Sequence, residues 1–449
     1  MRRVALLRTL AVAACAAVVL DCSSSSGTSP QSVGNLVVLI TEPEAATPSV
    51  TITGPGGYKR TLTASTLLSG LPVGTYTVTA DSVVAPDSIV GTFVDTASVS
   101  GSPAVLGSLD TAHVTVLYAN KRRLGGLWAA NGQVHTLPVY SPLQLRSSGG
   151  VLPADTLVGG VGYSLGIALD PSGNLWVAQY EGDTIVEYSV AARESHQGPT
   201  GLLADSAICA GYLAFDAHGN LWTPDVCNGV LVAFTPAQQA AGGNQTPAIT
   251  IHSAALLNPL SLAFDANGNL WVGDQGLTHI VEFTAAQLAA SGTVTPADTI
   301  GNNGALTSLQ AIAFDPGGNL WVTHYGVGIV EFTPAQLAAG GSPTPHVSIT
   351  SISYATGLAF DRRGGLWIGD YAYGLIYELT AAQLATSGAP FPAVTLTTLT
   401  SPLDIAPEGI VFDPGSTAVG VPAATHARPI SSRPSLASRA NPAVPRRRP

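Results

Sequence analysis

The sequence predicts an all-β protein in which a six-bladed β-propeller follows a small β-sandwich. Six tryptophans stand in a Leu-Trp pair preceded by glycine, at intervals of 48, 46, 49, 50 and 46 residues, and the chain has no other tryptophan. They are Trp128, Trp176, Trp222, Trp271, Trp321 and Trp367. A period of about 40 to 50 residues filled with short strands is typical of propellers, whose four-stranded blades cannot bury their own faces alone.

The third interval shows the order of elements expected within one blade. Alternating apolar and polar residues, broken by Ala266-Asn267-Gly268, predict strands over 261–265, 269–272, 279–283 and 297–300. A short helix is expected over 284–292, because Thr284 can cap it, Gln287 follows three residues later and Gly292 ends it. Equivalent helices are expected from residues 141, 235, 333 and 380, but not within 189–198.

The two ends of the repeat array predict how the ring closes. No Ala-Phe-Asp strand precedes Trp128, whereas one orphan copy of that strand, Gly409-Ile410-Val411-Phe412-Asp413, follows the last repeat. We expect this segment to supply the innermost strand of the first blade, which removes both exposed sheet edges. Truncation before Gly409 is therefore expected to open the ring.

The predicted domain order is a signal peptide over 1–22, a flexible tether over 23–33, a β-sandwich over 34–120, the propeller over 121–416 and a disordered tail over 417–449. Within the sandwich, residues 68–78 read Leu-Ser-Gly-Leu-Pro-Val-Gly-Thr-Tyr-Thr-Val. This stretch resembles the hairpin of prealbumin-like, or carboxypeptidase-regulatory-like, domains. The resemblance implies that Tyr76 and Val78 pack inward and carry no chemistry.

The N-terminus has the pattern of an export signal. Two arginines are followed by a mostly apolar run to Leu20, and Cys22 then opens a Ser-rich segment. This arrangement resembles a bacterial lipoprotein leader and implies lipid attachment at Cys22, with Cys15 as the alternative acceptor. We therefore expect a membrane-anchored lipoprotein of the cell envelope, with a secreted protein as the alternative.

Charge and cysteine positions narrow the class of partner and the compartment. Residues 23–416 carry nine Lys and Arg against 27 Asp and Glu, which argues against nucleic acid as a partner. The tail over 417–449 has six Arg and no acidic residue, so it can contact anionic surface polymers. Cys209 and Cys227 are equidistant from His218, and a hairpin centred there predicts a disulfide between them, which suits an exported protein.

The repeat units resemble a known family of propellers. Across residues 124–413 they follow the pattern Gly-Leu-Ala-Phe-Asp-x-x-Gly-Asn-Leu-Trp-Val-x-Asp, later followed by Ile-Val-Glu-Phe, which looks like NHL repeats and the related propeller of streptogramin lyases. The resemblance to the lyases implies a magnesium-assisted elimination that opens an ester linkage, with a His base and an acidic metal ligand. His324 is the candidate base here, although it does not stand at the matching position.

Three residues after each tryptophan stands a polar side chain, and these six positions are the candidate ligand or metal site. They are Asn131, Gln179, Asp225, Asp274, His324 and Asp370. If they surround one mouth of the propeller, they can hold Mg²⁺ or Ca²⁺ or bind a polar ligand. The simpler interpretation, which we favour, is that each caps its own turn by accepting backbone amide protons.

Two functional hypotheses follow. The first is a monomeric, non-enzymatic binding or interaction protein, with an unknown ligand or protein partner at the propeller face, because the repeat is regular and no catalytic cluster departs from it. The alternative is a metal-assisted lyase or hydrolase that uses the polar positions and His324. The sequence has no Gly-x-Ser-x-Gly, His-Glu-x-x-His or P-loop motif that would add a further enzyme class.

Overall fold

The computed structural model describes most of the chain between residues 32 and 413. The described residues are 32–41, 47–87, 91–119, 126–132, 135–158, 162–180, 182–195, 197–204, 208–301, 304, 306–398 and 406–413. The predicted leader and tail, with Cys15 and Cys22, lie outside them. Contacts between Cα atoms divide the chain into two units, one made of 1–40, 50–79 and 99–116 and the other of the remaining residues. In the described residues no helix has the length and apolar character that a membrane span requires.

The first nine strands form two sheets, as expected for a small β-sandwich. The sheet orders are β4-β1-β9-β7-β6 and β3-β2-β5-β8. The strands are β1 (Val33–Thr41), β2 (Val50–Gly54), β3 (Tyr58–Leu62), β4 (Thr66–Pro72), β5 (Gly74–Ala80), β6 (Val83–Asp87), β7 (Gly91–Ser100), β8 (Ala104–Leu106) and β9 (Thr111–Ala119), with a 3₁₀ turn η1 (Pro55–Gly57). Tyr76 and Val78 on β5 are buried, and the Tyr76 hydroxyl donates to the Pro72 carbonyl at 2.9 Å.

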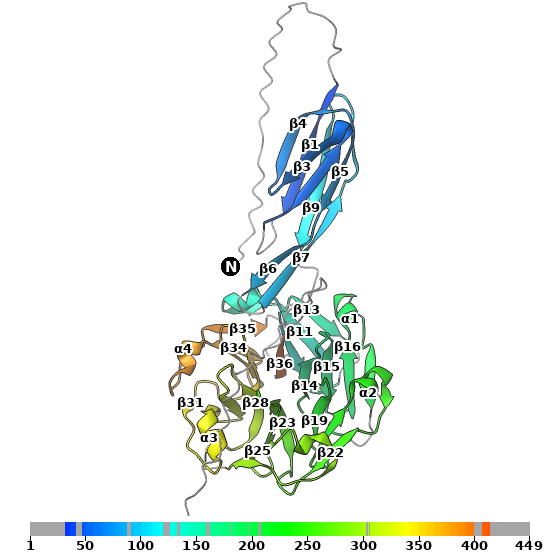
Figure 1. Ribbon diagram of the computed structural model, residues 1–449. Helices are drawn as coiled ribbons and strands as arrows, with labels where there is room; N and C mark the ends of the chain where they lie inside the picture. Colours follow the sequence, from blue (N-terminus) through cyan, green and yellow to red (C-terminus); the bar gives the residue numbers. More distant parts are fainter. Residues whose placement is uncertain are drawn as a thin grey trace, which may run out of the picture. The chain divides into compact units, whose positions relative to one another are not determined.

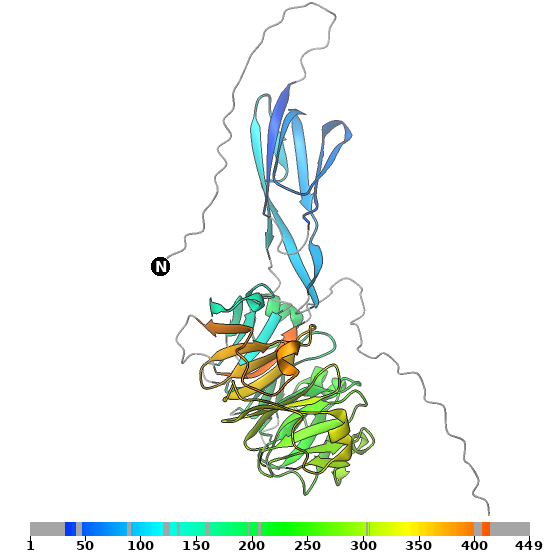
Figure 2. The ribbon, with the colours of Figure 1, turned by 90° about the vertical axis from the view of Figure 1, so that its left-hand side faces the viewer.

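The other described strands form six antiparallel sheets, each built on one tryptophan-bearing strand (Figure 1; Figure 2 shows the same sheets from the side). We number these sheets blades 1 to 6. From the inner strand outward, blade 1 is β36 (Pro407–Asp413), β10 (Gly126–Asn131), β11 (Thr136–Tyr140) and β13 (Asp155–Val158); blade 2 is β14 (Ser164–Leu169), β15 (Leu175–Gln179), β16 (Thr184–Tyr188) and β17 (Gly201–Ala204); and blade 3 is β18 (Ala214–Phe215), β19 (Leu221–Asp225), β20 (Val230–Phe234) and β22 (Ile249–His252).

Blades 4 to 6 repeat the same order, and these six sheets form a β-propeller. Blade 4 is β23 (Pro259–Phe264), β24 (Leu270–Asp274), β25 (His279–Phe283) and β27 (Asp298–Ile300); blade 5 is β28 (Leu309–Phe314), β29 (Leu320–His324), β30 (Gly328–Phe332) and β31 (Val347–Ile349); and blade 6 is β32 (Ala355–Phe360), β33 (Leu366–Asp370), β34 (Leu375–Leu379) and β35 (Val394–Thr398).

A helical turn follows the third strand of every blade. The turns are η2 (Gln144–Arg146), α1 (Val190–Ser195), α2 (Pro236–Ala241), η3 (Gln287–Ala289), α3 (Pro334–Ala339) and α4 (Ala381–Leu384). The expected Thr and Gln capping box is present in α2, α3 and α4. The turns η2 and η3 are single 3₁₀ turns, but the same two reciprocal bonds precede them, between Ser141 and Gln144 and between Thr284 and Gln287. The prediction that blade 2 lacks this helix was wrong. Ser189 caps α1 without a Gln partner, because its hydroxyl accepts from the Ala192 amide at 3.2 Å and the Asn174 side chain accepts the Val190 amide at 3.2 Å.

The segment after five of the six helical turns covers the outer edge of the preceding blade. The short strands β21 (Gly243–Asn244), β26 (Gly292–Thr293) and β12 (Gly149–Val151) pair in parallel with β17, β22 and β35. Parallel bridges from Gly341 to Ile300 and from Gly388 to Ile349 do the same for blades 4 and 5. This pairing uses edge hydrogen-bonding groups that would otherwise be open to another chain.

The turn between the first two strands ties each blade to the next. In blade 2, Asp170 accepts the amides of Ser172 and Asn174 through one oxygen and the Trp176 indole N–H through the other, at 3.2 Å. The indole then packs edge-to-face on Phe215 of blade 3, with ring centroids 6.3 Å apart. The same bonds and ring contacts recur at Asp216, Asp265, Asp315 and Asp361 with Trp222, Trp271, Trp321 and Trp367.

The ring closes as the orphan copy predicted. Strand β36 pairs antiparallel with β10, and the register sets Trp128 opposite Val411 and Gly126 opposite Asp413. The helix α1 adds a contact that the sequence did not reveal. Arg193, which is completely buried, forms an ion pair with Asp413 at 2.5 Å and lies 5.5 Å from the centre of the Trp128 ring.

Arg193 occupies a position that holds leucine in four other blades. Leu145, Leu288, Leu337 and Leu384 each pack into the cluster that contains the preceding blade's tryptophan. In blade 1 the Asp413 carboxylate bonds to Arg193 rather than to the indole, and the Trp128 N–H has no hydrogen-bond partner. The closing blade thus exchanges an indole bond for a buried ion pair between α1 and β36.

We expect Arg193→Ala to lower the free energy of unfolding by about 3 to 5 kcal/mol, because it leaves Asp413 buried without its cation. Arg193→Leu also removes the cation, but it should cost less than Arg193→Ala, since leucine packs at this position in four other blades whereas alanine leaves a cavity as well. Denaturant unfolding of the three proteins checks this, and equal losses for both variants would contradict it.

Candidate functional site

The six polar positions three residues after each tryptophan lie where the second strand of each blade ends. Their side chains are almost completely buried, with exposed fractions between 0% and 8%. The structure therefore places them at one end of the sheets but does not present them to solvent. Each must be judged by the groups that it contacts.

Three of these positions are aspartates that bind the chain's own loops. Asp274 accepts the amides of Leu257 and Asn258 through one oxygen, at 2.7 and 3.0 Å, and that of Leu277 through the other, at 2.7 Å. Asp370 accepts the Tyr373 amide at 3.0 Å, and burial raises the pKa of its carboxyl group. Asp274 and Asp370 therefore bind backbone amides, as expected if these positions hold turns and loops rather than a ligand.

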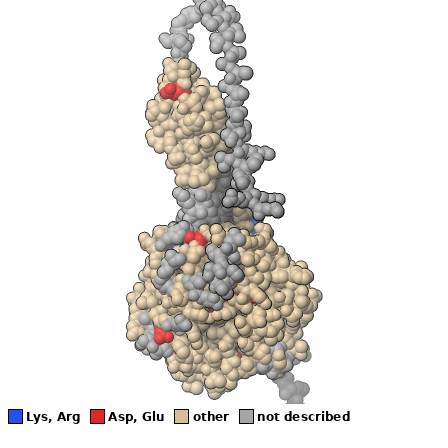
Figure 3. Space-filling model, turned by 180° about the vertical axis from the view of Figure 1, so that it is seen from behind, with Lys and Arg blue, Asp and Glu red and all other residues tan. Residues whose placement is uncertain are grey.

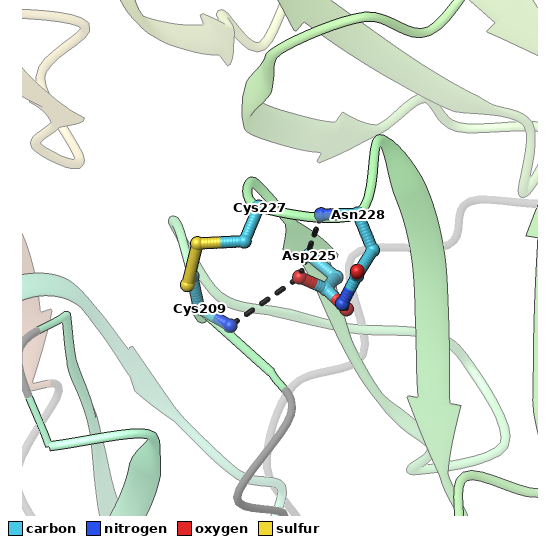
Figure 4. The surroundings of a disulfide bond; sticks show 4 residues. All are labelled: Cys209, Asp225, Cys227 and Asn228. Carbon is cyan, nitrogen blue, oxygen red and sulfur yellow. Dashed lines mark hydrogen bonds between the residues drawn. A yellow bond between two sulfur atoms is a disulfide. The ribbon is translucent and has the colours of Figure 1, made fainter.

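The third aspartate lies beside the disulfide, which the structure contains as predicted (Figure 4). Cys209 and Cys227 have Cα atoms 5.5 Å apart, within the range for such a bond. The Asp225 carboxylate accepts the amides of Cys209 and Asn228, each at 3.3 Å, and the Asn228 side-chain amide at 2.7 Å. The disulfide and the carboxylate together hold the loop before β18 against the end of β19.

The two amide positions also bind backbone. Asn131 accepts the Ala406 amide at 3.2 Å, a residue that directly precedes β36, and Gln179 accepts the Gly162 amide at 3.1 Å. The bond from Asn131 adds a side-chain contact to the strand pair that closes the ring.

His324 differs from the other five positions. The ring is completely buried, and its Nδ1 lies 3.0 Å from the Thr307 carbonyl oxygen. A carbonyl only accepts, so Nδ1 carries the proton. Burial lowers the pKa of His324, which favours the neutral ring, and its Nε2 lone pair has no hydrogen-bond partner. An unpaired buried nitrogen of this kind is uncommon in proteins.

The described side chains do not supply a cation site. Among them there is no group of three or more His, Cys, Asp or Glu that can hold a metal ion. The oxygens of Asp225, Asp274 and Asp370 accept backbone N–H groups, which a cation would have to replace. Binding of Mg²⁺ or Ca²⁺ stays a prediction from the sequence, and no chemical step is derived from it.

Six tyrosines that were not predicted as functional residues lie at this same end of the sheets. Tyr180, Tyr325 and Tyr371 directly follow Gln179, His324 and Asp370. Tyr163 directly precedes β14, Tyr354 directly precedes β32, and Tyr373 lies two residues after Tyr371. The contacts run in series from Tyr180 to Tyr163, and from Tyr371 through Tyr325 and Tyr354 to Tyr373, with ring centroids 5.0 to 6.4 Å apart. We call these six residues the tyrosine cluster.

Glu408 on β36 lies beneath the tyrosine cluster. Its side chain is 5% exposed and accepts the Tyr163 hydroxyl at 2.9 Å, while its carbonyl oxygen accepts the Tyr212 hydroxyl at 3.1 Å. Burial raises the pKa of Glu408 to about 7. Burial and Glu408 raise the pKa of Tyr163, and Tyr371 raises it further, so Tyr163 links the two series of rings.

The sequence did hold a signal for this cluster. The position four residues after each tryptophan is occupied in chain order by Gly132, Tyr180, Val226, Gln275, Tyr325 and Tyr371. Like the position before it, this position holds four residue types, but here three of the six residues are tyrosines. Glu408 stands where the other inner strands have Leu165, Gly211, Leu260, Gln310 and Thr356, so its charge also departs from the repeat.

Comparison with protein-family models found no match to the chain, and comparison with curated proteins found none either. Among solved structures, the propeller is similar to virginiamycin B lyase from Staphylococcus aureus, with 15% identity over 55% of this chain and 73% of that chain and a TM-score of 0.40. It is also similar to a structure titled as a nidogen/laminin complex, with 13% identity, coverage of 64% and 98% and a TM-score of 0.48.

A third similar structure is a protein of unknown function from Bacteroides caccae, with 10% identity, coverage of 64% and 98% and a TM-score of 0.45. These likenesses concern the β-propeller and assign no activity. The function therefore has to be argued from the side chains of this chain.

We expect the buried carboxyl group of Glu408 to make stability depend on pH. Its pKa is about 7 in the folded chain against 4.5 for the ordinary group, so its contribution is complete below pH 4.5 and is lost as pH rises through 7. The loss approaches about 3 kcal/mol. Glu408→Gln should remove this part of the pH dependence. Unfolding free energies of both proteins at several pH values check it, and parallel pH profiles would contradict it.

Proposed function

We propose that this chain is a non-enzymatic binding protein whose partner docks on the tyrosine cluster. The observation that carries the proposal is the pair of tyrosine series at one end of the propeller, in which three rings are exposed: Tyr180 and Tyr325 by 36% and Tyr373 by 59%. Tyrosine is enriched at the centres of protein interfaces, because it buries a large rigid surface and keeps a polar hydroxyl.

The partner that fits this surface is another protein. All six members of the tyrosine cluster are uncharged at neutral pH. Figure 3 shows one face of the molecule, on whose described surface Asp and Glu form only isolated spots. The cores of protein interfaces are likewise depleted in charge. The carboxyl group of Glu408 beneath the rings adds an acceptor for a donor group on the partner.

The cellular site proposed for this function is outside the cytoplasm. The disulfide between Cys209 and Cys227 supports export, because such bonds persist in oxidising compartments. Lipid attachment at Cys22, or at Cys15, stays a prediction from the leader sequence.

We expect the double variant Tyr325→Ala/Tyr373→Ala to bind the partner at least about 30-fold more weakly, since even one interface hot spot of this type contributes about 2 kcal/mol or more. The partner is first identified by cross-linking the purified protein to an extract of the producing cell's envelope. The affinities of the wild type and the variant for that purified partner are then measured.

Phe391→Ala is the matched control, because Phe391 is 92% exposed and lies outside the tyrosine cluster. It should bind like the wild type. Equal affinity for the double variant and the wild type, or an equal loss in the control, would remove the tyrosine cluster as the docking surface.

A second candidate function is the lyase or hydrolase suggested by the sequence. The observation in its favour is the unprotonated, unpaired Nε2 of His324, which can act as a base. Its complete burial opposes this role, because a substrate cannot reach the ring without a rearrangement. Ester hydrolysis or elimination by the purified chain with Mg²⁺, abolished in His324→Ala, would support the enzyme; absence of turnover in the wild type would exclude it.

A further inference from the structure

A crevice lies between blades 5 and 6 at the opposite end of the sheets from the tyrosine cluster. Its volume is about 480 Å³, within the range of small-ligand sites. The turn over 315–319, the turn over 362–364 and the start of α4 border it. Trp321, Phe360 and Leu384 supply apolar walls.

The residues at this crevice depart from the repeat. His346 donates its amide to the Glu331 carbonyl, a position held in the other blades by Ala154, Thr200, Ala248, Ala297 and Ala393. Arg362 stands in the turn where the other blades have Pro171, Ala217, Ala266 and Pro316. The repeat alone explains neither residue, and both border the same cavity.

The acidic groups around the crevice already have partners. Asp315 accepts two backbone amides, the Asn319 side chain and the Trp321 indole. The Glu331 carboxylate accepts from Nδ1 of His346 at 3.0 Å.

Arg363, the neighbour of Arg362, is paired as well. Its guanidinium group binds Asp361 at 2.8 Å and Glu378 at 2.6 Å. Arg362 is exposed, and no ion pair of it occurs among the described residues. The crevice therefore combines apolar walls with one cation, Arg362, that has no ion pair among the described residues. His346 hydrogen-bonds the Glu331 carboxylate at the same crevice.

We propose that this crevice is a second binding site, separate from the tyrosine cluster, for a small anion with an apolar body. The carboxylate or phosphate group of the ligand pairs with Arg362, and its aromatic or aliphatic part lies between the apolar walls. His346 acts as a positioning residue, because its bond to Glu331 keeps that carboxylate from repelling the anion. The guanidinium fork suits bidentate recognition of either anionic group.

Calorimetric titration of the full chain with four probes tests the proposal. The probes are phenylpropionate, phenyl phosphate, the neutral phenylpropanol and the short anion propionate. We expect one or both aromatic anions to bind at least about tenfold more tightly than phenylpropanol and propionate, because only they use both the cation and the apolar walls. The better of the two anions identifies the preferred head group.

Two variants locate the site without disturbing the fold, because the other blades already carry the replacement residue. Arg362→Ala and His346→Ala should each weaken the aromatic anion at least about tenfold. Arg60→Ala, an exposed arginine of the sandwich, is the matched control and should bind like the wild type. Binding of no aromatic anion above its neutral counterpart, or equal binding by wild type and Arg362→Ala, would overturn the proposal.

Discussion

The propeller depends on one contact that blades 2 to 6 each make with the next blade, the tryptophan indole that lies between two sheets. Its N–H is held by the aspartate of the preceding turn, and its ring packs on a phenylalanine of the neighbouring blade. Since a single four-stranded sheet cannot bury both faces, each blade is stable only between two others. The array must then close on itself, and β36 meets this requirement by pairing with β10.

Closure brings together residues that are far apart in the chain, and at this point the repeat departs from its own pattern. Blade 1 lacks the bond between Trp128 and the turn aspartate, and Arg193 of α1 binds Asp413 instead. Glu408 belongs to the same strand β36. The strand that closes the ring thus also delivers the buried carboxyl group beneath the tyrosine cluster.

The two ends of the blades have different duties. The turns that carry the aspartates are nearly identical and serve the contact between blades. Their carboxylate oxygens already accept the turn amides and the indole N–H, so they are not available to a ligand. The other end keeps one buried position per blade for holding loops, and the residue that follows it is free to vary. Functional surface can therefore be built there, or at a crevice such as that beside Arg362, without weakening the repeat.

The sequence by itself determined the class of fold, the number of repeats, the closing strand, the pairing of Cys209 with Cys227 and most of the short helices, because these follow from local periodicity, turn residues and caps. It also determined the six polar positions, although not what they contact. The tertiary structure decided that these side chains are buried and bind backbone, that the tyrosines one residue further on meet Glu408, and that Arg193 reaches Asp413. Several of these outcomes depend on contacts between distant parts of the chain, which are 275 residues apart in the bond from the Ala406 amide to Asn131 and 245 in the bond from Tyr163 to Glu408. No local pattern encodes such pairings.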